Sequence, residues 1–184
     1  LLLGASGVVG LVLGDGFLFQ AFVWIGPRLA MLLLSTAPAL ATLWAWWFLG
    51  ESLAPPEVLG ILVTILGVAW VVQARDHAAG LRDPRRYALG ILCGLGGAAG
   101  QAGGLILAKQ GMAGDFPALS ATLMRMVAAA AALWLYTLLR GQSRETLARF
   151  AKDRAAGWYT LAGSFLGPFA GVTLSLLAIQ HIAV

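Results

Sequence analysis

This sequence has few charged residues and almost no cysteine. Lysine, arginine, aspartate and glutamate make up 11% of its 184 residues, whereas soluble domains average about 25%. The single cysteine, Cys93, and the two histidines exclude a disulfide framework and a cysteine–histidine metal cluster. We therefore expect no metal and no cofactor. Hydrophobic residues account for 60% of the chain, which indicates a polytopic membrane protein.

Six apolar runs are long enough, or nearly so, to cross a bilayer. Backbone groups in lipid need internal hydrogen-bond partners, so we expect six helices and an all-α fold. A polar linker, residues 74–86, divides the runs into two groups of three, in residues 1–73 and 87–184. The runs are Leu1–Ile25, Leu29–Gly50, Pro56–Gln73, Ala88–Ala108, Phe116–Leu139 and Gly157–Val184.

Basic residues gather on one side of the predicted bundle. If the runs alternate in direction, one side carries ten of the twelve lysines and arginines, and the other carries only Lys109. The positive-inside rule then places the linker in the cytoplasm. Because these residues orient the chain in a lipid bilayer, the net charge of +4 does not indicate nucleic acid as a partner. The ten are Arg28, Arg75, Arg82, Arg85, Arg86, Arg140, Arg144, Arg149, Lys152 and Arg154.

Arg125 stands alone in an otherwise uncharged run, Phe116–Leu139. At about 1.5 Å per residue it lies roughly 14 Å deep in hydrocarbon. A guanidinium facing lipid there costs on the order of 3 kcal/mol or more, so we expect it to face protein or water. A residue that only locks helices together is the alternative. The residues one and two helical turns from Arg125 form a stripe of small side chains: Ala118, Ala121, Thr122, Ala128, Ala129 and Ala132.

Asp15 is the second charge inside an apolar run, and it is flanked by Gly14 and Gly16. Two glycines let the helix loosen locally, and a carboxylate at that depth is a candidate proton or substrate site. Pairing with Arg125 is the alternative. Further polar groups that would line a cavity or bridge helices are Gln20, Gln101, Thr122, Ser164 and Gln180.

The last apolar run looks like a copy of the first, with glycine, alanine and isoleucine at matching positions. The copies are five helices apart, an odd number, so they cross the membrane in opposite directions. Inverted five-helix repeats are typical of secondary transporters with a substrate site near the midplane. The positions that match at a shift of 157 are Gly10 and Gly167, Gly14 and Gly171, Ala21 and Ala178, and Ile25 and Ile182.

A polar notch interrupts the second run at Ser35, Thr36 and Pro38. Proline removes one helical hydrogen bond, so the notch exposes polar backbone groups to a cavity. The surrounding stretch, Leu32–Val72, closely resembles the EamA family of the drug/metabolite transporter superfamily. There a mid-helix proline, a glutamate at the helix end and a glycine-patterned helix recur. The matching residues here are Pro38, Glu51, Gly60 and Gly67.

The resemblance continues through the second half, where Pro117 precedes a helix that bears Arg125, as in the opening of an EamA repeat. It implies an inverted-repeat bundle of ten helices, of which this chain holds the third to the eighth and is truncated at both ends. Family members are usually drawn with the amino terminus inside, which would put the linker outside, opposite to the loop-charge prediction.

The resemblance also implies function: a carrier of the bacterial inner membrane that exports a small metabolite or an amphipathic compound by alternating access. In this interpretation Arg125 sets the electrostatics of the cavity, and Asp15 couples transport to protons or binds a cation. The backbone break between Ser35 and Pro38 supplies further polar groups that would bind the substrate. The predicted pathway residues are Asp15, Arg125, Ser35, Thr36, Pro38, Gln101 and Thr122, and the structural residues are Glu51, Gly60, Gly67 and Pro117.

Two alternatives to a carrier remain. The tetrapeptide Gly4–Gly7 matches the serine signature of rhomboid intramembrane proteases, with His181 as the base. Catalysis of that kind needs a hydrogen bond between nucleophile and base, which nothing in the sequence arranges. The second alternative is a scaffold subunit, which predicts Asp15 and Arg125 buried in pairs, whereas a carrier predicts a water-filled cavity lined by both.

Overall fold

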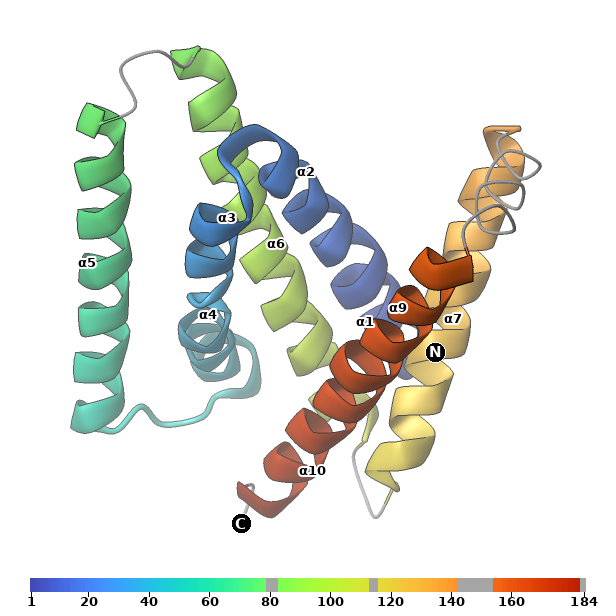
Figure 1. Cartoon of the computed structure of the whole chain (residues 1–184). Helices are drawn as coiled ribbons and strands as arrows, with labels where there is room; N and C mark the ends of the chain where they lie inside the picture. The colour runs from blue at the N-terminus through green and yellow to red at the C-terminus, as the bar shows by residue number, and fades with distance from the viewer. Residues whose placement is uncertain (79–82, 113–115, 142–153, 183–184) are drawn as a thin grey trace. The chain divides into compact units, whose positions relative to one another are not determined.

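The chain is an all-α polytopic membrane protein. The computed structural model describes residues 1–78, 83–112, 116–141 and 154–182 (Figure 1), and every regular element among them is a helix. Six helical segments are long and apolar enough to cross a membrane, as the apolar runs predicted. They are Leu2–Ile25, Pro27–Leu49, Pro55–Ala74, Pro84–Gly111, Ala118–Leu139 and Gly157–Ala178.

The chain folds into two compact units. The central unit is Val9–Ile106, and the terminal unit combines Leu1–Val8 with Leu107–Val184. The elements that lie wholly or mostly in the central unit are a π-helix η1 (Val8–Gly14), α2 (Asp15–Ile25), α3 (Pro27–Leu34), α4 (Ala37–Trp44), a π-helix η2 (Ala45–Leu49), α5 (Pro55–Ala78) and α6 (Pro84–Gly111). Those of the terminal unit are α1 (Leu2–Gly7), α7 (Ala118–Leu139), α9 (Arg154–Ser164), a π-helix η3 (Phe165–Gly171) and α10 (Val172–Ile182).

A tight turn at Gly26 joins α2 to α3. Gly26 has a φ of 83°, which glycine adopts without steric cost, and Pro27 follows as the first residue of α3. The turn brings the apolar faces of α2 and α3 together, and Val68 of α5 closes the cluster. The buried members of this core are Leu18, Ala21, Ile25, Leu29, Ala30, Leu33 and Val68.

Helix α6 packs through small residues. A Cβ added at Gly94 would come within 2.5 Å of Leu33 Cδ1, and one at Gly100 within 2.5 Å of the Gly14 Cα. One at Gly97 would lie 3.2 Å from Leu18 Cβ. These glycines therefore let α6 approach the first two spans at backbone distance, as small residues do between membrane helices.

The helices on either side of the predicted linker are longer than the apolar runs. Helix α5 continues through Ala78, and α6 already begins at Pro84, where Asp83 Oδ1 accepts a hydrogen bond from Arg85 N at 3.1 Å. The 28 residues of α6 extend over about 42 Å, more than the roughly 30 Å of hydrocarbon. Its polar first turn therefore reaches the interface, and residues 79–82 of the linker lie outside the described part of the chain.

In the terminal unit, α1 and α10 both pack against α7 (Figure 1). The side chains of α7 that are buried there are small, apart from Arg125, while Leu123, Leu133 and Trp134 are exposed. This division between a small buried stripe and a bulky outer face agrees with the sequence prediction. The buried members are Ala118, Ala121, Thr122, Arg125 and Ala129.

The first and last spans share an unusual winding. In the first span the π-helix η1 ends at Gly14 and α2 follows. In the last span the π-helix η3 ends at Gly171 and α10 follows. Both boundaries of the π-helix recur at the same offset of 157 residues. The sequence repeat therefore extends to the backbone, although the sequence alone did not predict a π-helix.

Candidate functional site

The second span is broken where the polar notch predicted it. Helix α3 ends at Leu34, and α4 begins at Ala37 with Pro38 as its second residue. The hydroxyl of Ser35 donates to the Leu32 carbonyl at 2.6 Å, and that of Thr36 to the Leu33 carbonyl at 2.7 Å. The two hydroxyls stabilise the end of α3, so the break is a defined feature of the span.

An apolar pocket of about 330 Å³ lies beside this break, inside the central unit. The buried side chain of Thr36 is its one hydroxyl-bearing residue. The remaining side chains come from α3 and α4, from α5 and from α6, and they are all hydrocarbon. They are Leu33, Ala39, Leu40, Ile65, Val68, Ala69, Val72, Ile91 and Leu95.

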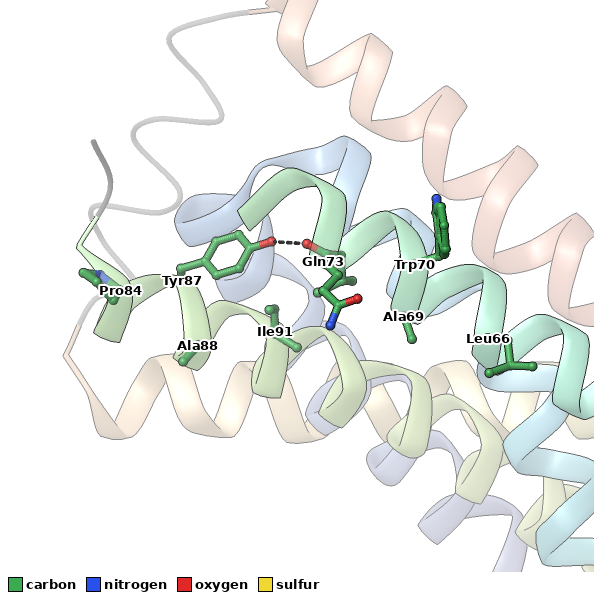
Figure 2. A pocket seen from close by; sticks show the side chains of 9 residues that line it. Leu66, Ala69, Trp70, Gln73, Pro84, Tyr87, Ala88 and Ile91 are labelled. Carbon is green, nitrogen blue, oxygen red and sulfur yellow. Dashed lines mark hydrogen bonds between the residues drawn. The ribbon is translucent and has the colours of Figure 1, made fainter. Parts of the chain in front are cut away.

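A second pocket of about 800 Å³ continues along α5 and α6, and Figure 2 shows it from close by. It shares Ala69, Val72 and Ile91 with the first pocket, so the two pockets adjoin. Tyr87 reaches from α6 toward α5, and its hydroxyl donates to the Val72 carbonyl at 3.1 Å. Trp70 also lines this pocket. The arrangement is a mostly apolar groove with polar side chains toward one end, which suits an amphipathic molecule.

Asp15 lies where the first span meets α6, directly after the π-helix η1. Its Oδ1 accepts a hydrogen bond from Gln101 Nε2 at 2.9 Å, and both residues are partly buried. Gly14 and Gly100 make the crossing close enough for this bond, since an added Cβ at Gly14 would lie 3.1 Å from Gln101 N. The structure thus brings two predicted pathway residues together. A π-helical turn, such as the one in η1 before Asp15, is frequent at functional sites.

Arg125 is buried in the terminal unit. Its side chain is 1% exposed, and its Nε and Nη1 have no hydrogen-bond partner among the residues that the structure describes. Helix α1 lies against its backbone, because a Cβ at Gly7 would clash with the Arg125 carbonyl oxygen and lie 2.9 Å from its Cα. The described residues of the terminal unit include no aspartate or glutamate. Buried polar atoms without a partner are rare, and a charge within a membrane span is a candidate functional group.

Thr122 lies almost one turn before Arg125 on the same buried face of α7. Its hydroxyl donates to the Ala118 carbonyl at 3.0 Å and lies 3.3 Å from Thr173 Oγ1 of α10. Thr173 also donates to the Phe169 carbonyl of η3 at 2.6 Å. The pair joins α7 to α10 just after the second π-helix.

Ser6, the serine of the protease-like tetrapeptide, is fully buried at the contact of α1 with α7. Its hydroxyl donates to the Leu3 carbonyl of its own helix at 2.6 Å. Gly7 serves packing, since an added Cβ there would clash with the backbone of Arg125, whereas one at Gly4 would lie 3.7 Å from Ala128 Cβ, an ordinary contact distance. The side chain of His181 lies outside the described part of the structure. Ser6 and Gly7 of the tetrapeptide therefore take part in helix packing.

The four predicted structural residues differ in what they do. Pro117 is the N-cap of α7 and accepts a hydrogen bond from Ala121 N at 3.0 Å. Glu51 follows Gly50, whose φ of 69° ends η2. At Gly60 and Gly67 an added Cβ would meet no described atom within 4 Å, so neither glycine supports a close helix contact in the part of the chain that the structure describes.

Sequence reasoning missed Thr173, Tyr87 and Trp70 as site residues. Thr173 had one available signal, because it lies at the repeat offset from Gly16, beside the position that matches Asp15. Tyr87 and Trp70 line the groove through the way α5 and α6 meet, and neither occurs in a recognisable motif. Of the predicted pathway residues, Arg125 and Thr122 belong to the terminal unit and the other five to the central unit.

Comparison with known protein families gives a match. The pattern of the EamA-like transporter family fits residues 1–73, which cover the first three spans, the break at Pro38 and the Asp15 side of the site. Curated proteins and solved structures give no match. The assignment of residues 87–184 to a second repeat of the same family stays a prediction. Over residues 1–73 this chain is therefore similar to the EamA-like transporter family.

Proposed function

We propose that this chain belongs to a secondary carrier of the bacterial inner membrane, which exports small metabolites or amphipathic compounds by alternating access. Its family match supports membrane transport in general. The finer proposal depends on the polar residues of the spans, which a protein held only by apolar packing would not need.

The observation that carries the proposal is the repeated span with a polar pair behind each π-helix. Asp15 directly follows η1 and bonds to Gln101 of α6. Thr173 follows η3 by two residues and lies against Thr122 of α7. Spans related by an inverted repeat, each with a local irregularity and polar groups at mid-membrane, are typical of alternating-access carriers.

Within this proposal each residue has a different role. Asp15 takes up and releases the coupling proton, and Gln101 holds its carboxylate in place in either protonation state, since an amide can both donate and accept. The groove between α5 and α6 accommodates the apolar part of the substrate, and the break before Pro38 lets the second span bend. Arg125 provides the positive charge that sets the electrostatics of the substrate cavity.

An efflux panel with cells that express the full-length protein tests this function. Wild-type protein should lower the cellular content of at least one compound, and a proton uncoupler should abolish the effect. Asp15→Asn should abolish it too, because the amide cannot carry a proton. Gln20→Ala is the matched control and should keep the export. The sequence suggested that Gln20 lines a cavity or bridges helices, but in the structure its side chain is exposed on the same helix. If no compound is exported while the protein is present in the membrane, the proposal is wrong.

A further inference from the structure

We propose that Arg125 binds the carboxylate of a monoanionic organic substrate. The proposal rests on the transport function above and deepens it by naming the charge and the chemical group of the cargo. It starts from a charged and buried side chain, two of whose nitrogens have no hydrogen-bond partner in the part of the chain that the structure describes.

A guanidinium cannot lose its proton to escape burial, so its charge must be compensated. The polar side chains that flank the contact of α1 with α7 do not do this. Ser6 and Thr122 are neutral, and their hydroxyls donate to the Leu3 and Ala118 carbonyls. The described residues of the terminal unit include no carboxylate. Among these residues the donors at Nε and Nη1 have no partner, and in this proposal a ligand supplies both the oxygen atoms and the negative charge.

The side chain of Arg125 is buried beside a close contact of α1 with α7, where the Gly7 backbone lies against the Arg125 backbone. The other buried positions on this face of α7 include Ala118, Ala121 and Ala129, which carry only a methyl group. Such small side chains obstruct a ligand group less than leucine would at the same positions. The hydroxyl of Thr122 is a further polar group on the same buried face.

The single positive charge selects a monoanion. One carboxylate neutralises Arg125 and leaves a neutral complex, which is the least costly state for a site that moves through the low dielectric of a membrane. A phosphate monoester carries about −1.5 to −2 charges at neutral pH and would leave part of its charge uncompensated. The planar fork of arginine also matches a carboxylate better than lysine does.

Thermal unfolding of the purified full-length protein in detergent tests the proposal, with pairs of probes that differ only in charge. The probes are acetate, benzoate and phenylacetate, each compared with its amide. At least one carboxylate should raise the melting temperature of the wild-type protein saturably, and its amide should not. Arg125→Gln should weaken this response about tenfold or more, as expected for the loss of charge-assisted hydrogen bonds.

Arg140→Gln is the matched control, because Arg140 ends the same helix, is exposed and lies 5.1 Å from the Tyr136 ring centre. It should leave the response unchanged. Arg125→Lys covers the case in which the glutamine variant does not fold, and it should weaken the response while keeping the charge.

An equal response in wild-type and Arg125 variants would overturn the proposal, because the carboxylate would then bind elsewhere. The absence of any carboxylate preference in the wild-type protein would also overturn it and would assign the partner of Arg125 to another part of the protein. Export of neutral compounds by the full-length protein in that case would show that the carrier function stands while the proposed cargo is wrong.

Discussion

At the scale of single residues, the absence of a side chain is as important as its presence. Gly7 and Gly16 belong to the same membrane span, yet their surroundings differ. A Cβ at Gly7 would lie against the backbone of Arg125, whereas one at Gly16 would meet no described atom within 4 Å. Gly7 therefore determines how closely α1 approaches α7, and Gly16 does not take part in a helix contact of the described chain.

Gly7→Ala should destabilise the protein by about 1–3 kcal/mol, the usual cost of an extra methyl group at a full contact. Gly16→Ala should be neutral or stabilise by up to about 1 kcal/mol, because alanine is the better helix former. Melting temperatures of the two full-length variants check this. Equal melting temperatures would show that α1 does not touch α7 at Gly7.

At the scale of helical elements, the sequence predicted the existence of the helices better than their winding. Apolar runs predict membrane helices because unpaired backbone groups are excluded from lipid. The same rule is satisfied by α- and π-helical bonding alike, so η1 and η3 could not be distinguished from α-helix in advance. The break at Ser35 and Thr36 was predictable, because proline removes a specific hydrogen bond.

The residues of the candidate site were predictable to a similar extent. Arg125 and Asp15 stand out because a charge in an apolar run is costly. Gln101 was recognised as polar, but its bond to Asp15 depends on the Gly14–Gly100 crossing, which is a tertiary contact. Thr173 and Tyr87 were missed for the same reason. Their roles follow from which helices meet, and a single sequence does not contain that information.

Pro38→Ala should join α3 and α4 into one continuous helix. We expect a gain in stability of at most about 3 kcal/mol, since a backbone hydrogen bond becomes possible again, together with slower transport of any exported compound. Pro27→Ala is the control, because a proline at the first position of a helix costs no hydrogen bond. Melting temperature and initial transport rate of both variants test the expectation, and an unchanged rate in Pro38→Ala would show that the break has no part in transport.

At the scale of the whole molecule, basic residues predict the orientation of the six spans. Ten of the twelve lie on the side of the α5–α6 connection if the spans alternate. The positive-inside rule places that side in the cytoplasm. The usual drawing of the family places it outside, so the two expectations can be separated by one labelling experiment.

We expect a cysteine at position 79 to resist a membrane-impermeant thiol reagent in intact cells and to react after permeabilisation. A cysteine at position 52, at the other end of α5, should react in intact cells. The variants Ala79→Cys and Ser52→Cys are made in a Cys93→Ala background, which removes the one native thiol. The reverse labelling pattern would support the family's usual orientation and contradict the charge count.

The central claim is that this chain moves a solute across a membrane, and counterflow in proteoliposomes tests it most directly. Purified full-length protein is reconstituted, the vesicles are loaded with one unlabelled compound from a panel of metabolites, and entry of the same labelled compound is followed. We predict that at least one compound accumulates transiently above its equilibrium level, and that Asp15→Asn preserves this exchange while losing proton-driven accumulation. The account would be contradicted if, with the protein folded and inserted, every labelled compound entered these vesicles no faster than it enters protein-free vesicles.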